Sequence, residues 1–124
     1  MSRILVVDDK ATSRELIRTV LESIGHTVSE AGDGREAVRV ALDILPDLVL
    51  LDLQMPALDG FGVVKELRAD PRFATLPIVA LTASAMHGDR ERALASGFTS
   101  YITKPVTLAA LRTEVARLLL RASH

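Results

Sequence analysis

The chain has 124 residues, which is enough for one domain with a core of ordinary size and too few for a second. Its formal net charge of -1 gives no basis for electrostatic binding to nucleic acid or to an anionic membrane, and the lack of cysteine excludes disulfides, thiolate metal sites and a cysteine nucleophile. The apolar runs are too short to cross a bilayer, and the first begins too early for a signal peptide, so we expect a cytoplasmic protein.

The chain begins with an apolar run that ends in two carboxylates. Residues 4–7 read Ile-Leu-Val-Val, which is typical of a strand buried on both faces, and Asp8 and Asp9 follow directly. Residues 10–24 have helical periodicity, and Gly25 follows where a helix C-terminal glycine belongs. The apolar face expected for this helix comprises Leu16, Ile17, Val20, Leu21 and Ile24.

A weaker strand, a capped helix and a second buried strand come next. Residues 26–31 are more polar, which favours a strand at a sheet edge. Asp33 and Glu36 have the spacing of an N-cap and its partner three residues on, and this signal opens a helix that ends near Pro46. Residues 48–52 read Leu-Val-Leu-Leu-Asp, a buried strand that again ends in a carboxylate.

The second half of the chain continues the alternation of helices and strands. A loop rich in turn residues leads into a helix over about 61–69. Residues 78–82 form a buried strand that ends in a threonine, and residues 83–97 are predicted to be a helix. Residues 98–105 contain the last strand and a proline stop, after which Thr107 can cap a final helix.

This alternation predicts the fold class. Strands separated by helices of this length need crossover connections, which are right-handed and give a parallel sheet with helices on both faces. We therefore predict an α/β domain over residues 1–124, with one open, doubly wound sheet of five strands and five helices. Ligands bind such sheets outside the carboxyl ends of the strands. The polar side chains expected to converge there are those of Asp8, Asp9, Asp52, Thr82 and Lys104.

The convergent side chains have the chemistry of a phosphoryl-accepting aspartate. Three carboxylates held together repel one another, so either one stays protonated or a hard cation such as Mg²⁺ lies among them. A lysine supplies a compact positive charge suited to a phosphate oxygen. Taken singly, Asp8 is more simply a helix cap, Thr82 a strand-end hydroxyl and Lys104 a solvated lysine. Capping does not explain why all of them lie at one edge of the sheet, so we favour a site.

Four spaced motifs together resemble the receiver domain of two-component response regulators. They are Asp-Asp at 8–9, DLQMPALDG at 52–60, LTA at 81–83 and Lys-Pro at 104–105, and they extend over essentially the whole chain. The resemblance implies a flavodoxin-like sheet with the strands, numbered along the chain, in the order 2-1-3-4-5. It also implies that Asp52 accepts a phosphoryl group from a histidine kinase or a phosphotransfer protein.

The resemblance also assigns roles around the acceptor. Asp9 and Asp52 would bind Mg²⁺ through their side chains, Gln54 through its backbone carbonyl, and Asp8 mainly through metal-bound water. Lys104 would contact the phosphoryl group.

Three further residues carry roles implied by the resemblance. Thr82 would turn toward the phosphoryl group after transfer, and Tyr101 matches the aromatic position that couples to it. Simple packing of the Tyr101 ring explains that residue equally well. Pro105 would follow a cis peptide bond.

The expected partners are the phosphodonor and a downstream protein effector, with no nucleic acid and no membrane. The first turn of the helix over 10–24 is a candidate part of the docking surface for the kinase, and Arg14 and Arg18 belong to the mixed polar face of that helix. The chain ends about where the final helix should, so we expect no attached output domain. It would then be either a stand-alone receiver or a receiver excised from a larger protein. Beyond its own phosphorylation and dephosphorylation, we expect no enzymatic activity.

Two alternatives belong to other functional classes. A phosphatase of the haloacid-dehalogenase type also uses an aspartyl-phosphate and Mg²⁺, but it needs a second aspartate two residues after the nucleophile, where this chain has Gln54. A pseudo-receiver would keep the fold as a binding module without accepting phosphate. The complete polar set argues against it, and a phosphorylation assay decides.

Overall fold

The computed structural model describes residues 2–53, 55, 58–83 and 89–122. Its five strands are β1 (Arg3–Val7), β2 (Thr27–Ala31), β3 (Leu48–Asp52), β4 (Ile78–Thr82) and β5 (Ser100–Thr103). Its helices are α1 (Ala11–Ser23), α2 (Gly34–Ile44), α3 (Gly60–Arg68), the 3-10 turn η1 (Pro71–Phe73), α4 (Asp89–Ala95) and α5 (Leu108–Ala122).

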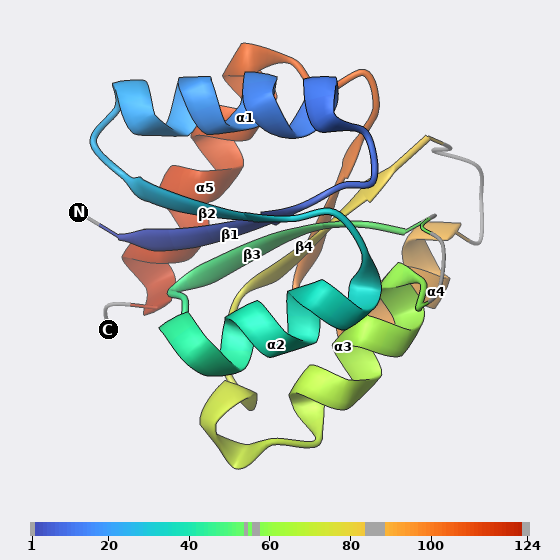
Figure 1. Ribbon diagram of the computed structural model, residues 1–124. Helices are drawn as coiled ribbons and strands as arrows, with labels where there is room; N and C mark the ends of the chain where they lie inside the picture. The colour runs from blue at the N-terminus through green and yellow to red at the C-terminus, as the bar shows by residue number, and fades with distance from the viewer. Residues whose placement is uncertain (1, 54, 56–57, 84–88, 123–124) are drawn as a thin grey trace.

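The strands form one parallel sheet in the order β2-β1-β3-β4-β5, as predicted. The first strand, β1, lies beside the β2 edge, and the chain moves to that edge before it crosses back over β1 to add β3, β4 and β5. Helices α1 and α5 cover one face, and α2, α3 and α4 cover the other (Figure 1). The order of the strands reverses between β1 and β3, which is where doubly wound sheets form their ligand site.

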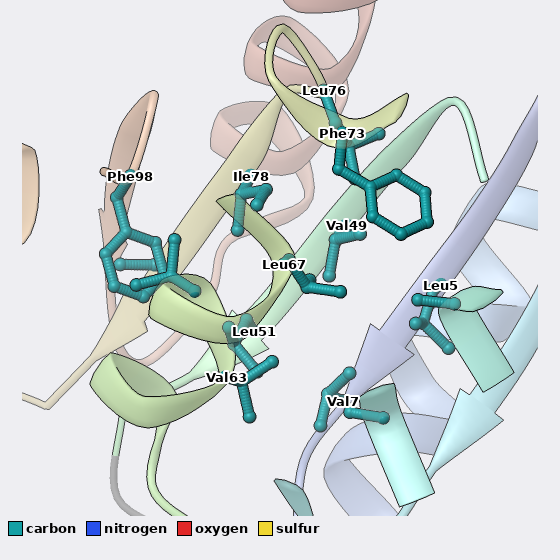
Figure 2. Close-up of a cluster of buried hydrophobic side chains, with 14 of the residues drawn as sticks. Leu5, Val7, Val49, Leu51, Val63, Leu67, Phe73, Leu76, Ile78 and Phe98 are labelled. Atoms are coloured by element: carbon teal, nitrogen blue, oxygen red, sulfur yellow. The ribbon is translucent and has the colours of Figure 1, made fainter. Parts of the chain in front are cut away.

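The three central strands, β1, β3 and β4, are apolar along most of their length, and helices cover both of their faces. Alternate residues point to opposite faces, so each strand contributes to two separate hydrophobic clusters. The cluster under α2, α3 and α4 includes the strand residues Leu5, Val7, Val49, Leu51 and Ile78, which meet Val63, Leu67 and Phe98 (Figure 2). The cluster under α1 and α5 includes Ile4, Val6, Leu48, Leu50, Ile17, Leu21, Leu111 and Val115. These clusters hold the strand ends that carry the polar residues.

The helix start predicted at Asp33 is confirmed, with a different partner for Glu36. The Glu36 backbone N–H donates to Asp33 Oδ1 at 2.8 Å, so Asp33 is the N-cap of α2. The Glu36 carboxylate accepts from the backbone N–H of Gly32 at 2.7 Å, one residue before the cap. Thr107 caps α5 through the N–H of Ala110 at 3.1 Å, also as expected.

Two expectations for the helices are corrected. Ile17 and Leu21 of α1 are buried, but Leu16 is 63% exposed and Ile24 is 40% exposed. Neighbouring residues on a helix point about 100° apart, so an arc centred on Ile17 and Leu21 turns Leu16 to solvent. The helix expected over 83–97 is shorter within the described residues, where α4 begins at Asp89 and ends at Ala95.

Within the described residues, no helix combines the length and the apolar character needed to cross a membrane.

Candidate functional site

Three carboxylates meet at the carboxyl edge of the sheet. Val7 of β1 pairs with Leu51 of β3, so the next residues along both strands, Asp8 and Asp52, emerge side by side. One oxygen from each of Asp8, Asp9 and Asp52 lies within 4.8 Å of the others. Asp8 is fully buried, Asp52 is 6% exposed and Asp9 is exposed. The group is therefore open to solvent on the side of Asp9.

Lys104 supplies the countercharge for the two buried carboxylates. Its Nζ atom donates to Asp8 Oδ2 and to Asp52 Oδ2, at 3.2 Å in each case. The backbone N–H of Lys104 donates to the carbonyl of Thr82 at 2.6 Å, which fixes the lysine to the end of β4. The Lys104–Pro105 peptide bond is cis, as expected for Pro105.

The pKa of Lys104 reflects two opposing effects. Burial lowers the pKa of the ammonium group because it penalises the charged form. Hydrogen bonds and charges from Asp52, and then from Asp8, favour the charged form, and the net result is a pKa above the ordinary lysine value. Lys104 is therefore held as a cation between the two carboxylates.

Asp8 does not cap α1, because the N-cap residue is Lys10 and no side chain caps it. The Oδ1 atom of Asp8 accepts from the backbone N–H of Lys10 at 2.9 Å, so one oxygen shapes the turn into α1. Its Oδ2 atom faces Lys104 in the site. One oxygen of the Asp8 carboxylate therefore bonds within the turn before α1, and the other bonds to Lys104 at the edge of the sheet.

Thr82 and Tyr101 lie on neighbouring strands. Thr82 ends β4 and is 8% exposed. Tyr101 of β5 pairs with Ala80, two residues before Thr82 on the same face of β4, and its half-buried ring packs against the cluster under α2, α3 and α4. The guanidinium carbon of Arg90 lies 5.6 Å from the centre of this ring. Gln54, expected to offer its carbonyl to a metal, lies outside the described residues.

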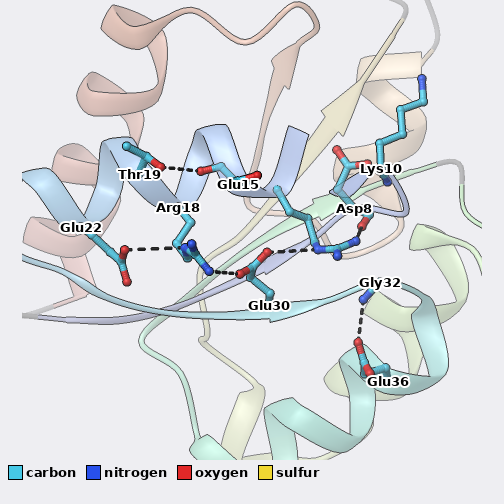
Figure 3. A network of polar contacts seen from close by, with 10 residues as sticks. Asp8, Lys10, Glu15, Arg18, Thr19, Glu22, Glu30, Gly32 and Glu36 are labelled. Atoms are coloured by element: carbon cyan, nitrogen blue, oxygen red, sulfur yellow. Dashed lines mark hydrogen bonds and ion pairs between the residues drawn. The ribbon is translucent and has the colours of Figure 1, made fainter. Parts of the chain in front are cut away.

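The sequence did not predict how Arg14 is used. Its Nη1 atom donates to the backbone carbonyl of Asp8 at 2.6 Å, and its Nε atom pairs with Glu30 Oε1 at 3.2 Å. Arg18 pairs with the other oxygen of Glu30 at 2.6 Å, as Figure 3 shows. Both arginines expected in a docking surface are thus engaged within the chain. The sequence feature that could have indicated this pairing was the polar character of residues 26–31, which include Glu30.

The donor set fits a hard divalent cation. Mg²⁺ prefers oxygen ligands, uses one or two carboxylates and keeps water molecules, and this cluster offers two buried carboxylates and one exposed carboxylate. A doubly wound sheet with an acidic cluster and a lysine at its carboxyl edge has the parts that a magnesium-dependent phosphoryl-transfer protein needs.

Comparison with known proteins identifies the family. The model of the response regulator receiver domain matches residues 4–116, so the chain belongs to this family and is a receiver domain of two-component signalling. This assignment sets aside the phosphatase alternative.

Relatives and solved structures agree with the family assignment. An uncharacterized 14.6 kDa protein of Leptolyngbya boryana is 46% identical over 83% of this chain and 79% of its own length. The DNA-binding dual master transcriptional regulator RpaA of Synechocystis is 38% identical over 100% of this chain but only 52% of its own length. The receiver domain of the sensor histidine kinase PA1611 from Pseudomonas aeruginosa PAO1 is 37% identical, with a TM-score of 0.88 over 95% of this chain and 97% of that one. That structure is described with a magnesium ion coordinated in the active site cleft.

The relatives differ in what accompanies the receiver. This chain spans about half of RpaA, which is named as a DNA-binding protein. The expectation that nucleic acid is not among the partners is therefore not supported.

Proposed function

We propose that residues 1–124 form one receiver domain in which Asp52 accepts a phosphoryl group from a phosphohistidine on a histidine kinase or a phosphotransfer protein. The observation that carries this proposal is the position of the Asp52 carboxylate. It lies at the end of β3, 3.2 Å from the ammonium group of Lys104 and beside two further carboxylates. A carboxylate placed in this way can act as a nucleophile while the lysine contacts an oxygen of the incoming group.

The transfer exchanges one bond to phosphorus for another. A carboxylate oxygen of Asp52 forms the new bond to phosphorus, the bond between phosphorus and the imidazole nitrogen breaks, and the electron pair stays on that nitrogen. Lys104 already donates to Asp52, so it needs little movement to reach the transferred oxygens. The domain would in this way promote its own phosphorylation and the later hydrolysis of the aspartyl-phosphate. We expect it to catalyse no other reaction.

The acidic cluster would hold Mg²⁺ during transfer. Bound there, the cation would offset the negative charge of the phosphoryl oxygens and the carboxylates. Asp9 and Asp52 would hold it through their side chains, and the backbone carbonyl of Gln54 remains a predicted ligand. Both oxygens of Asp8 already accept hydrogen bonds, one from Lys10 and one from Lys104, which supports a role through metal-bound water.

Phosphorylation would act on a downstream protein effector in the cytoplasm by shifting the equilibrium between two conformations. The added acceptor oxygens on Asp52 would attract the hydroxyl of Thr82, and the Tyr101 ring would then change its packing. Tyr101 packs on the face of β4 to which Ala80 points, which supports this relay. Thr82→Ala should still accept phosphate but lose most of the gain in effector affinity that beryllofluoride, a phosphoryl mimic, produces in the wild type.

A phosphorylation assay tests the acceptor. Incubation with acetyl phosphate or a phosphorylated kinase, with Mg²⁺ or with a chelator, should give acid-labile phosphate on the wild type and none on Asp52→Asn. Asp43→Asn, at an exposed position in α2, is the matched control and should react like the wild type. Normal phosphorylation of Asp52→Asn would rule out this nucleophile, and an unreactive wild type would favour the pseudo-receiver.

A further inference from the structure

The backbone of Asp8 is held from two neighbouring elements. Its N–H donates to the carbonyl of Ala31 at the end of β2, at 3.2 Å. Its carbonyl accepts from the guanidinium group of Arg14 in α1, at 2.6 Å. The contact from Arg14 is a charge-assisted hydrogen bond, which is shorter and stronger than one between neutral groups.

The guanidinium group of Arg14, which donates to the Asp8 carbonyl, is itself held in place by an ion pair. Arg14 Nε pairs with Glu30 Oε1 at 3.2 Å, and the other oxygen of Glu30 pairs with Arg18 Nη1 at 2.6 Å. Figure 3 shows Glu30 facing α1, with a dashed line to Arg18, and both of its ion-pair partners belong to that helix. The side chains of Arg14 and Glu30 are 20% and 26% exposed, so solvent screens this pair only in part. Glu30 therefore orients Arg14 toward the acidic site.

The carbonyl of Asp8 belongs to the peptide unit that joins Asp8 to Asp9. This unit is planar, so a hydrogen bond to its oxygen fixes the plane and limits rotation on both sides of it. Asp8 is also held through its side chain by Lys104, whereas Asp9 is exposed. The direction of the Asp9 carboxylate thus depends strongly on the orientation of this peptide plane.

We propose that Arg14 and Glu30 form a positioning pair that aims the Asp9 carboxylate at the site shared with Asp8 and Asp52 and thereby sets the affinity for Mg²⁺. This inference rests on the proposed function, because it concerns the cation that assists phosphoryl transfer. It gives Arg14 a role inside the domain, whereas the docking role expected from the sequence remains a prediction. Groups that orient metal ligands from outside the ligand set commonly change metal affinity by about 10-fold to 100-fold.

The test measures Mg²⁺ binding directly, by calorimetric titration of the unphosphorylated protein without a phosphodonor. Arg14→Met keeps the apolar stem but removes the donors, and it should weaken Mg²⁺ binding about tenfold. Arg18→Met is the matched control, because it removes the other partner of Glu30 one turn further from the site. The Mg²⁺ affinity of this variant should stay within about twofold of the wild type. Arg14→Lys keeps a donor for the carbonyl and should recover part of the loss.

A second perturbation leaves Arg14 in the chain. A Cβ atom at Gly32 would lie 3.3 Å from Arg14 Nη1, closer than an ordinary contact, so Gly32→Ala should push the guanidinium group aside by a few tenths of an ångström. We expect a smaller loss of Mg²⁺ affinity than in Arg14→Met. Thermal unfolding in chelator identifies which variants are folded. If Arg14→Met fails to fold, the Mg²⁺ affinity of Gly32→Ala decides whether the positioning pair stands.

Each outcome separates the positioning role from the proposed function. If the wild type binds Mg²⁺ and Asp9→Asn does not, unchanged affinity in Arg14→Met overturns the positioning pair and leaves the proposed function standing. Equal losses in Arg14→Met and Arg18→Met also overturn it, because they would reflect a general loosening of α1. A wild type that binds no Mg²⁺ removes the metal part of the proposed function, and the positioning role with it.

Discussion

Replacing Lys104 with methionine should destabilise the domain most strongly when divalent cations are absent. The side chain of Lys104 is 23% exposed, and the side chains of its partners Asp8 and Asp52 are 0% and 8% exposed. Methionine fills similar space but leaves both carboxylates without this cation. Removing one partner of a buried ion pair costs about 3–5 kcal/mol, and the partial exposure of Lys104 reduces this to about 2–4 kcal/mol. For a domain of this size, such a loss lowers Tm by about 10 °C.

Urea unfolding followed by circular dichroism measures this loss in chelator and again in millimolar Mg²⁺. Mg²⁺ should narrow the difference between Lys104→Met and the wild type, because a bound cation supplies positive charge to the same carboxylates. Lys65→Met, at an exposed position in α3, is the control and should change the free energy of unfolding by less than about 0.5 kcal/mol. The reasoning is refuted if Lys104→Met is as stable as the wild type in chelator.

The remaining predictions concern pH and a second partly buried cation, Arg68. The pKa of Lys104 is raised above 10.5, so the stability it contributes is complete below pH 10.5 and is lost as the pH rises through the folded-state pKa. Stability curves of the wild type and Lys104→Met should therefore converge in strong alkali, and a constant gap would contradict the ion-pair account. Arg68 donates to two backbone carbonyls outside α3, at 2.9 and 2.6 Å, and burial lowers its pKa. Arg68→Met should lower the free energy of unfolding by about 3 kcal/mol in a denaturant titration and leave Mg²⁺ affinity unchanged. A loss below about 1 kcal/mol would show that water replaces these two hydrogen bonds.

Much of the fold was predictable because the central strands have a strong and simple pattern. Residues 48–52 and 78–82 are buried along their whole length, and only a strand covered on both faces requires such a run. Once the sheet is parallel, the carboxyl ends of β1, β3 and β4 must share an edge, so Asp8 and Asp52 had to meet. A helix start such as that at Asp33 depends on a hydrogen bond between residues close in sequence, so the sequence alone predicts it.

The contacts of Arg14 were not predictable for a different physical reason. Arg14 and Glu30 are 16 residues apart and belong to different elements, so their pairing depends on how α1 lies over β2 and on the side-chain rotamers. No periodic pattern encodes either quantity. The exposure of Leu16 has a related cause, since periodicity identifies an apolar arc but does not say which of two adjacent residues lies at its centre.

The position of β2 at the edge of the sheet has a consequence for self-association. An edge strand offers backbone hydrogen-bonding groups to any extended chain that approaches it, and charged side chains on such strands discourage the approach. Glu30, close to the end of β2 and fixed there by two arginines of α1, places three charged groups beside this edge. A strand added here would have to remove water from these charges, which opposes the growth of an intermolecular sheet. The same contacts that orient a backbone carbonyl near the site would thus also help to keep the domain from aggregating.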